Sequence, residues 1–565
     1  MGKTVAIGIQ SFDEIRQDNY FYIDKTDFIR EWWESGDKVT LITRPRRFGK
    51  TLNMSMIETF FSVDYKDRGN LFEGLSIWEQ EKYRRMQGTY PVIFLSFANV
   101  KECDFLSTKQ RICRLIVDLY SKHWDLLKSD VLKEHEKKYF MEIAEKNVDM
   151  SEEMATSAIH KLSDFLRRYY GKKVIILLDE YDTPMQEAYV NGYWEELVAF
   201  TRSLFNSTFK TNPYLERALM TGITRVSKES IFSDLNNIEV VTTTCDKYAT
   251  SFGFTEEEVF VSLEECGYGN QKDVVKRWYD GFTFGSTSDI YNPWSILNFL
   301  NKGTIGTYWA NTSSNALVSK LLQEGSKRIK MSFEDLLKGK SIEYVIDEQI
   351  AYNQLNRGEE AVWSLLLASG YLKVLRKEPQ ELVVSGYPRY ELMLTNLEVK
   401  HMFEGMIHEW FYEPNQSYNE FVDALLLGNL DSMNEYMNMV SEEIFSSFDV
   451  GKKPSRLQPE RFYHGFVLGL IVDLAREYVV SSNRESGFGR YDVVIEPRDT
   501  NGTAFIFEFK VYDPKREASL EETVQNALAQ IEEKKYEANL IAKGIPRENI
   551  RKYGFAFEGK RVLIG

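Results

Sequence analysis

Two carboxylates and a lysine near the C-terminal end of the sequence have the types and spacing that phosphodiester chemistry needs. Asp492 begins one β-branched run, and Glu508 and Lys510 lie in the next apolar run, with Glu508 16 positions after Asp492. Alternation along a strand puts Glu508 and Lys510 on one face. Carboxylate oxygens from neighbouring strands bind hard divalent cations, which activate water and neutralise charge on phosphate. The pattern predicts a metal site at Asp492 and Glu508, with Lys510 orienting water or stabilising the transition state.

The same strand has a structural alternative. Glu508 and Lys510 are the charged residues of an otherwise apolar run, and burying a charge costs free energy unless it is paired or bound to a metal. An ion pair between these two side chains would meet that need without catalysis. Two further polar residues favour the catalytic interpretation. Glu460 opens the preceding predicted helix, and Gln530 lies in the following one, Leu520–Glu537.

The turn between the two runs decides whether the carboxylates can share a metal. A two-residue loop at Asn501-Gly502, the usual hairpin signal, would make paired residue numbers sum to 1003 and put Asp492 and Glu508 on opposite faces. A shared face requires an even sum, and directly opposed carboxylates require 1000. We therefore predict an odd-length loop, most simply Arg498–Gly502, with the carboxylates about 4–6 Å apart. A β-bulge is the alternative route to the same parity.

A second group of residues, near the N-terminal end, has the order of a phosphate-binding loop. The apolar run Lys38–Thr43 leads into a basic segment, and a helical pattern follows to about Phe61. Amides at such a helix N-terminus bind anions, Lys50 would reach the β- and γ-phosphates, and Thr51 would hold Mg²⁺. Arg44 replaces the usual first glycine, so a basic surface loop is the alternative. The residues predicted to bind the nucleotide are Arg44, Arg46, Arg47, Phe48, Gly49, Lys50 and Thr51.

Acidic residues at the end of a later strand favour a nucleotide site over a basic surface loop. The apolar run Val174–Leu178 is followed by Asp179 and Glu180. Asp179 would hold the metal through water and Glu180 would polarise the attacking water, whereas two solvated acids are the alternative. Thr221 ends the next apolar run and is a candidate sensor of the γ-phosphate. Arg225 would supply positive charge, although both residues also fit ordinary loop positions.

Two different α/β arrangements have to position these candidates. The first 250 residues or so alternate short β-branched runs with longer amphipathic stretches, which predicts a mostly parallel sheet of the P-loop NTPase type. The expected strands are Lys38–Thr43, Pro91–Phe97, Lys173–Asp179, Arg217–Ile223 and Glu239–Thr243. Near the C-terminus the pattern predicts an apolar helix at Phe462–Val480, two strands and a polar amphipathic helix.

The segment between these arrangements has a more helical pattern with aromatic clusters. We predict a helical lid or winged-helix-like module, in which clusters such as Trp278-Tyr279 are core packing, with a base-stacking surface as the alternative. A strand-and-helix segment follows at Glu391–Phe411, and Gly451–Ser455 is a predicted linker. The expected domains are residues 1–254, 255–454 and 455–565.

Composition restricts the class of protein. A chain of 565 residues is too long for one hydrophobic core. No run of 18 uncharged apolar residues and no signal-peptide pattern is present, so no membrane association is expected. The four scattered cysteines suggest neither a zinc site nor disulfides, which fits a reducing cytoplasm. The net charge of −15 opposes a nucleic-acid partner, but residues 455–565 contain 17 basic and 17 acidic residues, so the deficit lies elsewhere.

Together these residues resemble those of a bacterial family of AAA-ATPase-like proteins with a C-terminal PD-(D/E)XK nuclease domain of restriction-endonuclease-like α/β fold. The segments that carry the resemblance are Tyr22–Thr26, Arg44–Thr51, Leu178–Asp182, Thr221–Arg225, Leu235–Asn237, Tyr291–Pro293, Glu460–Gly465, Gly489–Asp492, Glu508–Lys510 and Ala529–Ile531. An arginine-rich P-loop is usual in such proteins, so Arg44 is compatible with an active site. The roles that the resemblance implies are metal binding for Asp492 and Glu508, catalysis for Lys510, and auxiliary functions for Glu460 and Gln530.

These observations predict an ATP-binding, Mg²⁺-dependent nuclease that acts on DNA under nucleotide control, with ATP implied by the resemblance. In the rival interpretation, the chain is a nucleotide-dependent switch or scaffold whose nuclease-like domain binds a partner or nucleic acid without cutting. The acidic N-terminal portion favours the rival, and the intact set of Asp492, Glu508 and Lys510 favours the enzyme. A homo-oligomer is compatible with either interpretation.

Overall fold

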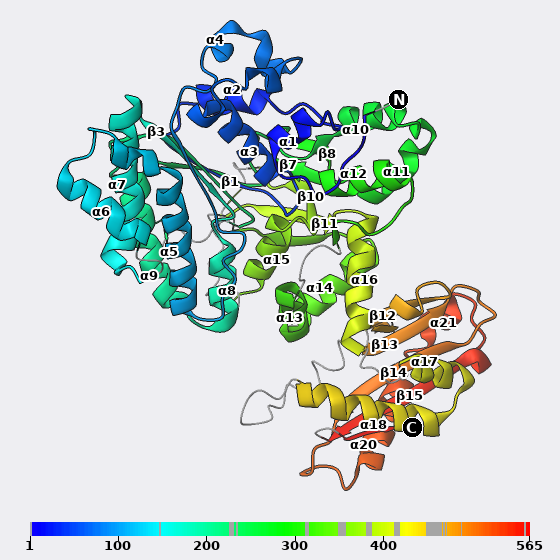
Figure 1. Ribbon diagram of the computed structural model, residues 1–565. Helices are drawn as coiled ribbons and strands as arrows, with labels where there is room; N and C mark the ends of the chain where they lie inside the picture. Colours follow the sequence, from blue (N-terminus) through cyan, green and yellow to red (C-terminus); the bar gives the residue numbers. More distant parts are fainter. Residues whose placement is uncertain are drawn as a thin grey trace. The chain divides into compact units, whose positions relative to one another are not determined.

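In a computed structural model, the chain folds into two compact units (Figure 1). Unit 1 comprises Met1–Ser314 and Glu343–Val399, and unit 2 comprises Asn315–Ile342 and Lys400–Gly565, so the predicted middle segment contributes to both. The structure describes residues 3–145, 149–224, 231–232, 235–310, 316–347, 358–379, 383, 387–411, 418–447, 466, 469–470, 472–486, 489–558 and 561–565.

The core of unit 1 is a five-stranded parallel sheet in the order β2-β3-β4-β1-β5. Its strands are β1 (Val39–Thr43), β2 (Val92–Ser96), β3 (Val174–Asp179), β4 (Leu215–Gly222) and β5 (Ile238–Val241), which confirms the five predicted strands to within two residues at each end. Every residue of β3 is buried, as expected for a strand covered on both faces. Because β4 lies between β1 and β3, the carboxyl ends of these three strands meet at one edge of the sheet.

Helices cover both faces of this sheet (Figure 1). One face shares a hydrophobic core with α1 (Phe12–Gln17), α2 (Asp27–Glu34) and α3 (Lys50–Phe61), and Ile175 and Leu177 of β3 point into that core. The other side is covered by α5 (Phe105–Lys122), α7 (Glu152–Tyr170) and α9 (Trp194–Phe205). The shorter connecting helices are α4 (Glu81–Arg84), α6 (Glu134–Glu145) and α8 (Thr183–Asn191).

A smaller module follows the parallel sheet. Its antiparallel sheet has the order β6-β8-β7 and contains β6 (Phe254–Thr255), β7 (Phe282–Phe284) and β8 (Thr287–Tyr291). Three helices accompany it, α10 (Glu256–Glu265), α11 (Lys272–Tyr279) and α12 (Pro293–Lys302). Thr255 and Glu258 form a capping box at the start of α10, and Asn292 caps α12. Tyr279 is buried in the module's core, so this member of the aromatic cluster is core packing, as predicted.

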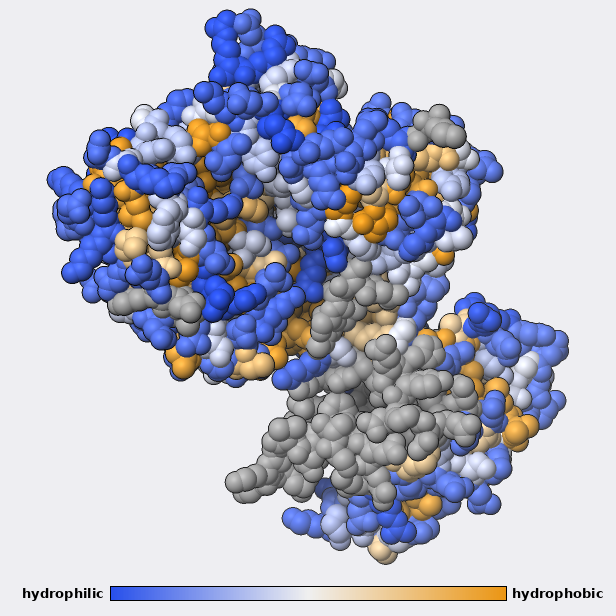
Figure 2. All heavy atoms as spheres, in the orientation of Figure 1, coloured by the Kyte–Doolittle hydropathy of each residue, from blue (hydrophilic) through white to orange (hydrophobic). Residues whose placement is uncertain are grey.

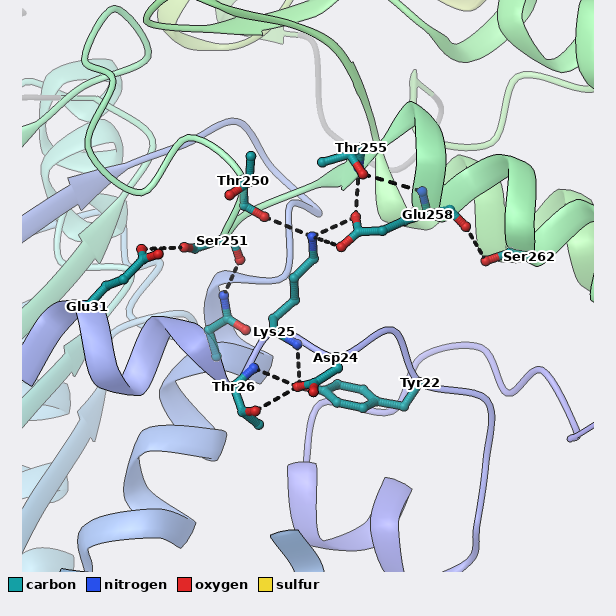
Figure 3. Close-up of polar contacts among 11 residues, drawn as sticks. Tyr22, Asp24, Lys25, Thr26, Glu31, Thr250, Ser251, Thr255, Glu258 and Ser262 are labelled. Atoms are coloured by element: carbon teal, nitrogen blue, oxygen red, sulfur yellow. Dashed lines mark hydrogen bonds and ion pairs between the residues drawn. The ribbon is translucent and has the colours of Figure 1, made fainter. Parts of the chain in front are cut away.

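The N-terminal segment bonds this module to the parallel-sheet core (Figure 3). The Lys25 ammonium donates to both carboxylate oxygens of Glu258 at 2.7 Å and to the carbonyl of Thr250 at 2.8 Å. The side-chain amide of Asn53, on α3, donates to the carbonyl of Ser251 at 2.9 Å. Burial lowers the pKa of Lys25, and the charge of Glu258 opposes that change. These contacts attach α3, the helix that begins in the phosphate loop, to the chain segment that enters the module.

A third sheet completes unit 1. It has the order β10-β11-β9, with β9 (Ile342–Val345), β10 (Leu372–Lys377) and β11 (Arg389–Leu394), and α15 (Glu359–Ala368) precedes β10. The helix α16 (Leu397–Phe411) follows β11, which confirms the strand-and-helix segment predicted at Glu391–Phe411. The chain passes between the two units at Ser314–Asn315, at Ile342–Glu343 and at Val399–Lys400, and the last of these boundaries lies inside α16.

Unit 2 contains a five-stranded mixed sheet in the order β12-β13-β14-β15-β16, in which β14 and β15 are parallel and the other neighbours antiparallel. Its strands are β12 (Tyr478–Ser486), β13 (Gly489–Pro497), β14 (Ala504–Val511), β15 (Ile550–Glu558) and β16 (Arg561–Ile564). Its helices include α13 (Ala316–Glu324), α14 (Lys327–Leu337), α17 (Tyr418–Leu427), α18 (Leu430–Ser447), α20 (Leu520–Lys534) and α21 (Ala538–Ala542).

The prediction of two strands for this region was incomplete. β12 occupies the last three residues of the predicted helix Phe462–Val480, so the helix assignment is wrong for Tyr478–Val480. A short apolar run fits a helix and a strand equally well, and pairing with β13 decides the matter here. The rest of that predicted helix lies partly outside the described residues.

The two faces of the unit 2 sheet differ in chemistry. On one face, Ala556 of β15 packs against Leu520 and Val524 of α20. On the other face, the rings of Phe509 and Phe555 stack with centroids 4.6 Å apart. Alternation along β14 puts Glu508 and Lys510 on the α20 face, opposite to the face of Phe509. The charged residues of β14 therefore lie between the sheet and a helix.

In the part of the chain that the structure describes, no helix combines the length and the apolar character needed to cross a membrane. The view of the surface in Figure 2 is mostly hydrophilic, with dispersed hydrophobic residues. Cys103, Cys113, Cys245 and Cys266 are free thiols.

Candidate functional site

The β13–β14 pairing brings the two carboxylates of unit 2 to the same face. Val493 pairs with Phe507, Val494 with Ile506 and Ile495 with Phe505, so paired numbers sum to 1000. Continued by one residue, this register sets Asp492 opposite Glu508. The amide of Phe509 also donates to the Asp492 carboxylate at 2.9 Å. The predicted even sum of paired residue numbers is confirmed, and the Asn501-Gly502 pair does not form a two-residue turn.

Glu508 is a buried carboxylate with an incomplete set of partners. It is 4% exposed, and its Oε1 accepts a hydrogen bond from the Gln530 side chain. Its Oε2 has no hydrogen-bond partner among the described residues. Burial and the charge of Asp492 raise the pKa of Glu508 to about 8, while Lys510 and hydrogen bonds from the Asp492 backbone and the Gln530 side chain act in the opposite direction. A divalent cation held by Asp492 and Glu508 fits this site, because it would bind the unpartnered oxygen and offset the repulsion of the two charges.

Gln530 of α20 holds the two charged side chains of β14. Its Oε1 accepts from the Lys510 ammonium at 2.8 Å, and its Nε2 donates to Glu508. The Nε2 also lies 3.2 Å from the hydroxyl of Tyr536. Within the described residues, Lys510 and Glu508 form no direct ion pair, unlike the structural alternative considered from the sequence. Gln530 therefore separates the lysine from the carboxylate while bonding to both.

The phosphate-loop candidate in unit 1 lies between β1 and α3. Gly49 adopts a left-handed conformation with φ 76° and precedes the first residue of α3, Lys50. The Lys50 ammonium is buried and donates to the carbonyls of Arg44 at 2.9 Å and Pro45 at 2.8 Å. Burial lowers the pKa of Lys50, and the nearby charge of Glu180 is the largest opposing influence. The Lys50 ammonium therefore bonds the backbone of its own loop and lies near the carboxylates of Glu180, Asp179 and Asp182.

Two side chains predicted to bind the nucleotide have structural contacts instead. Arg44 is fully buried, and its guanidinium donates to the carbonyls of Thr43 at 3.0 Å and Thr242 at 2.7 Å. Phe48 is also fully buried, with its ring 4.7 Å from that of Phe282. These side chains anchor the loop, so any contact with a nucleotide from Arg44 or Phe48 has to come from the backbone.

Arg46 and Arg47 are the exposed basic residues of the loop. Arg46 donates to the side chain of Gln186 at 3.2 Å. The Arg47 guanidinium lies over the ring of Trp294, 4.4 Å from the ring centroid, and Arg47 has a left-handed backbone with φ 64°. Both guanidinium groups therefore remain at the surface beside the loop.

Asp179 is the centre of a buried polar network at the edge of the parallel sheet. Thr51 of α3 donates to one carboxylate oxygen at 2.7 Å, and Thr221 of β4 donates to the other at 2.5 Å. Burial raises the pKa of Asp179, and the two threonine hydroxyls lower it. A hydroxyl and a carboxylate in contact beside the loop form a donor set suited to Mg²⁺.

Glu180 and Asp182 follow β3 in a turn. Glu180 has a left-handed backbone with φ 52°, and its carboxylate accepts from the hydroxyl of Thr183 at 3.2 Å. The Asp182 carboxylate is buried and accepts from the amides of Ile223 and Thr224, each at 2.9 Å. Burial raises the pKa of Asp182, and these amides lower it. Asp182 therefore holds the segment that leaves β4 directly after Gly222.

Comparisons with known proteins divide the chain in the same way as these two sites. Residues 6–232 match the family model described as "Predicted AAA-ATPase", and residues 458–565 match the model described as "PD-(D/E)XK nuclease superfamily". The chain has an AAA-ATPase-like N-terminal region and a C-terminal PD-(D/E)XK nuclease superfamily domain. The resemblance inferred from the sequence motifs is thereby confirmed.

A relative shares nearly the full length of this arrangement. The chain is 25% identical over 559 residues to an uncharacterized protein in the vnfD 5′ region of Azotobacter chroococcum mcd 1, covering 96% of this chain and 95% of the relative. A solved structure of a Signal Transduction ATPase with Numerous Domains protein from Pyrococcus horikoshii aligns over 80% of this chain and 48% of its own, with 13% identity and a TM-score of 0.23. This chain spans about half the length of that structure.

Most candidates predicted from the sequence lie in the two clusters described above, whereas two neighbouring residues were not predicted. In the AAA-ATPase-like region, sequence reasoning did not single out Asp182, although the Leu178–Asp182 segment was part of the resemblance. In the nuclease superfamily domain it missed Tyr536, whose hydroxyl contacts Gln530 from just beyond the C-terminal end of α20. The predicted candidates Arg225 and Glu460 lie outside the described residues.

Proposed function

We propose that this chain is a Mg²⁺-dependent nuclease that cleaves DNA under the control of ATP binding and hydrolysis. The observation that carries the proposal is the buried carboxylate of Glu508, which has an unpartnered oxygen and lies opposite Asp492 in the β13–β14 register. Two facing carboxylates in an apolar sheet destabilise the fold unless a ligand compensates their charge. The matches to a nuclease superfamily and to an AAA-ATPase family support the two reaction classes.

In the nuclease superfamily domain, Asp492 and Glu508 would hold the cation through their oxygen atoms. When bound, the cation would activate water and neutralise charge on the scissile phosphate. Lys510 has its ammonium on the same face and would orient water or stabilise charge that develops on the phosphate. Gln530 keeps Lys510 and Glu508 in position through its two hydrogen bonds. Glu460 is assigned an auxiliary role.

In the AAA-ATPase-like region, the loop from Arg44 to Thr51 would bind the phosphates of ATP. Lys50 would exchange its bonds to the loop carbonyls for bonds to phosphate oxygens, which are stronger acceptors because they are charged. Thr51 and Asp179 would hold the magnesium ion of the nucleotide. Glu180 would accept a proton from the attacking water. Thr221 and Arg225 are assigned to sensing the γ-phosphate.

Cleavage assays with the purified full chain test this proposal. Supercoiled plasmid and single-stranded DNA are incubated with the protein, with and without Mg²⁺ and ATP. We expect cleavage that requires Mg²⁺, changes with ATP, and is lost in Asp492→Asn and in Glu508→Gln. A matched control is Glu496→Gln, since Glu496 lies on the same strand four residues farther along and is bonded to Lys543 at 2.6 Å. This control should cleave like the wild type.

A folded wild type that binds Mg²⁺ and DNA without cleaving either substrate would contradict the nuclease proposal. That result would support a nucleotide-dependent switch or scaffold whose nuclease superfamily domain binds a partner. Cleavage that persists in both Asp492→Asn and Glu508→Gln would instead locate the activity outside the proposed site.

A further inference from the structure

The loop assigned to phosphate binding is bonded to the start of α12. The side-chain amide of Asn292 donates from its Nδ2 to the carbonyl of Arg46 at 3.3 Å. The Oδ1 of the same side chain accepts from the amides of Trp294 at 2.9 Å and Ser295 at 3.3 Å, and so caps α12. Asn292 is fully buried. A change in the position of the Arg46 carbonyl therefore acts directly on the first turn of α12.

The first turn of α12 is bonded in turn to the first turn of α16. The Ser295 hydroxyl donates to one carboxylate oxygen of Glu398, the second residue of α16, at 2.7 Å. The other oxygen of Glu398 accepts from the amide of Trp309 at 2.6 Å. Ser295 is fully buried, and Glu398 is 1% exposed. These buried contacts leave little room for the two helix starts to move independently.

A second route joins the loop to α16 without using α12. Gly370, with φ 85°, packs so closely on the ring of Pro45 that a Cβ atom there would lie 2.8 Å from the Pro45 Cγ. The carbonyl of Gly370 accepts from the Thr395 hydroxyl at 2.7 Å, and the Thr395 amide donates to the carbonyl of Tyr371 at 3.2 Å. Thr395 stands two residues before α16. Two independent sets of contacts thus converge on the same helix start.

The first route begins at Arg46 and the second at Pro45, and both residues are close to Lys50. The Lys50 ammonium bonds the carbonyls of Arg44 and Pro45, directly before Arg46. If the Lys50 ammonium turns to bind phosphate, these carbonyls lose their hydrogen-bond donor. Backbone amides of the same loop then donate hydrogen bonds to the phosphate. Nucleotide binding therefore changes the loop at the positions where the two routes to α16 start.

We infer that α16 transmits the nucleotide state of the phosphate loop from unit 1 into unit 2. The helix is anchored through Thr395 and Glu398 in unit 1 and continues without a break beyond the unit boundary at Val399–Lys400 to Phe411. This inference rests on the proposed function and gives it a means of regulation. Ser295 and Asn292 are positioning residues in it and do not contact the nucleotide or the metal.

Hydrogen exchange of the full chain, measured with and without Mg²⁺ and ATP, tests the inference. In the wild type we expect ATP to slow amide exchange in Leu397–Met406 at least threefold, because a ligand that orders the loop also opposes local opening of elements bonded to it. Ser295→Ala removes the hydroxyl that joins α12 to Glu398. It should bind ATP within threefold of the wild type by calorimetry, and still protect α3, while the ATP effect on α16 falls at least twofold.

The matched control is Ser262→Ala, in α10. Ser262 is also a buried helical serine, but its hydroxyl donates within its own helix, to the carbonyl of Glu258 at 2.6 Å (Figure 3). This control should keep the full response of α16. Asn292→Asp provides a second test variant, because aspartate caps a helix as well as asparagine does but has no amide to donate to Arg46. It should also weaken the ATP effect on α16.

The possible failures are distinguishable. If the wild type binds ATP and exchange in α16 is unchanged, the inference is wrong while the proposed ATP site stands. A full wild-type response in both Ser295→Ala and Asn292→Asp would also overturn it. If calorimetry shows no ATP binding by the wild type, the proposed nucleotide control and the inference are both overturned.

Discussion

Lys50, Asp179 and Glu508 are ionisable residues buried almost completely, and each is compensated in a different way. Lys50 donates to backbone carbonyls, Asp179 accepts from two threonine hydroxyls, and Glu508 retains an unpartnered oxygen. Burying such groups costs free energy, and Asp182 and Glu398 are buried as deeply at positions to which no catalytic role is assigned. At the residue scale, the candidate sites are therefore marked by buried charge together with a second feature, namely the phosphate-loop context of Lys50 and Asp179 and the unpartnered oxygen of Glu508.

Replacing Lys50 tests the phosphate loop directly. We expect Lys50→Ala to weaken ATP binding roughly 30- to 100-fold, since a charge-assisted hydrogen bond contributes about 2–3 kcal/mol and 1.4 kcal/mol is tenfold in affinity. Isothermal titration calorimetry measures the change, and circular dichroism checks that the fold is retained. Lys101→Ala, at an exposed position, is the control and should bind normally. Unchanged affinity in Lys50→Ala would remove the basis for the phosphate site.

Glu180 is predicted to act on hydrolysis rather than on binding. The amide of Glu180→Gln cannot accept a proton from water, so we expect the ATPase rate to fall about 100-fold or more. The affinity for ATP should stay within a few-fold of the wild type. Phosphate release under single-turnover conditions measures the rate. Equal rates in variant and wild type would rule out this role for Glu180.

At the scale of elements, the positions of the candidates depend on how helices and strands begin and pair. The β13–β14 register sets Asp492 opposite Glu508, and a loop longer or shorter by one residue in that pairing would separate them. In unit 1, the helices α10, α12 and α16 begin with side chains that also bond other elements, namely Glu258, Asn292 and Glu398. Single substitutions at helix starts should therefore affect packing beyond the helix itself.

The Lys25–Glu258 contact is one such link. Lys25→Met would leave the Glu258 carboxylate without its cationic partner in a partly buried site, with side-chain exposures of 10% and 26% in the native pair. We expect a loss of about 1–2 kcal/mol in the free energy of unfolding, below the 3–5 kcal/mol of a fully buried pair. Urea unfolding measures the loss. Lys272→Met, from the more exposed pair with Glu264, should lose less than about 0.5 kcal/mol. Equal losses would argue against a special role for the Lys25 contact.

Glu398 should make the stability of unit 1 depend on pH. Burial raises the pKa of Glu398 to about 6, while bonds from Ser295 and from backbone amides lower it. A carboxyl whose pKa is higher in the folded chain than in the unfolded chain stabilises the fold at low pH, and this contribution is lost as the pH rises through about 6. Between pH 5 and pH 7.5 the loss amounts to about 1 kcal/mol.

Glu398→Gln removes this titration. The difference in unfolding free energy between variant and wild type should therefore shift by about 1 kcal/mol in favour of the variant as the pH rises from 5 to 7.5. Urea unfolding at the two pH values measures the shift. A difference that is the same at both pH values would show that Glu398 has no raised pKa in the folded chain.

At the scale of the whole molecule, the two compact units should respond to different ligands. A ligand that binds only the folded state stabilises it by about 2.7 kcal/mol at 100 times its dissociation constant. We expect ATP to raise the unfolding temperature of unit 1, and Mg²⁺ without nucleotide to raise that of unit 2. Differential scanning calorimetry with domain assignment by limited proteolysis separates the two responses.

Variants identify the site behind each thermal response. Asp492→Asn should abolish the response of unit 2 to Mg²⁺ and leave the response of unit 1 to ATP intact. Lys50→Ala should have the opposite pattern. Loss of both responses in a variant that still shows the wild-type circular dichroism spectrum would contradict two separate sites.

The sequence by itself determined the class of both α/β units, the five strands of the parallel sheet, the two candidate site motifs and the parity of the β13–β14 pairing. These features follow from local periodicity, from residue types at strand ends, and from the requirement that two carboxylates share a face. The strands β12, β15 and β16 were not predicted, because a short apolar run fits a helix and a strand equally well. Pairing with a neighbouring strand, which the fold decides, resolves the ambiguity.

Only the tertiary structure decided which side chains of the predicted sites are available to a ligand. Arg44 and Phe48 belong to the loop motif by sequence, yet long-range packing against Thr242 and Phe282 directs both side chains into the core. Ser295 reaches Glu398, and Asn292 reaches the carbonyl of Arg46, through contacts between distant segments. A local pattern specifies which chemistry a residue can carry out. Its burial and its hydrogen-bond partners depend on segments that the fold brings together.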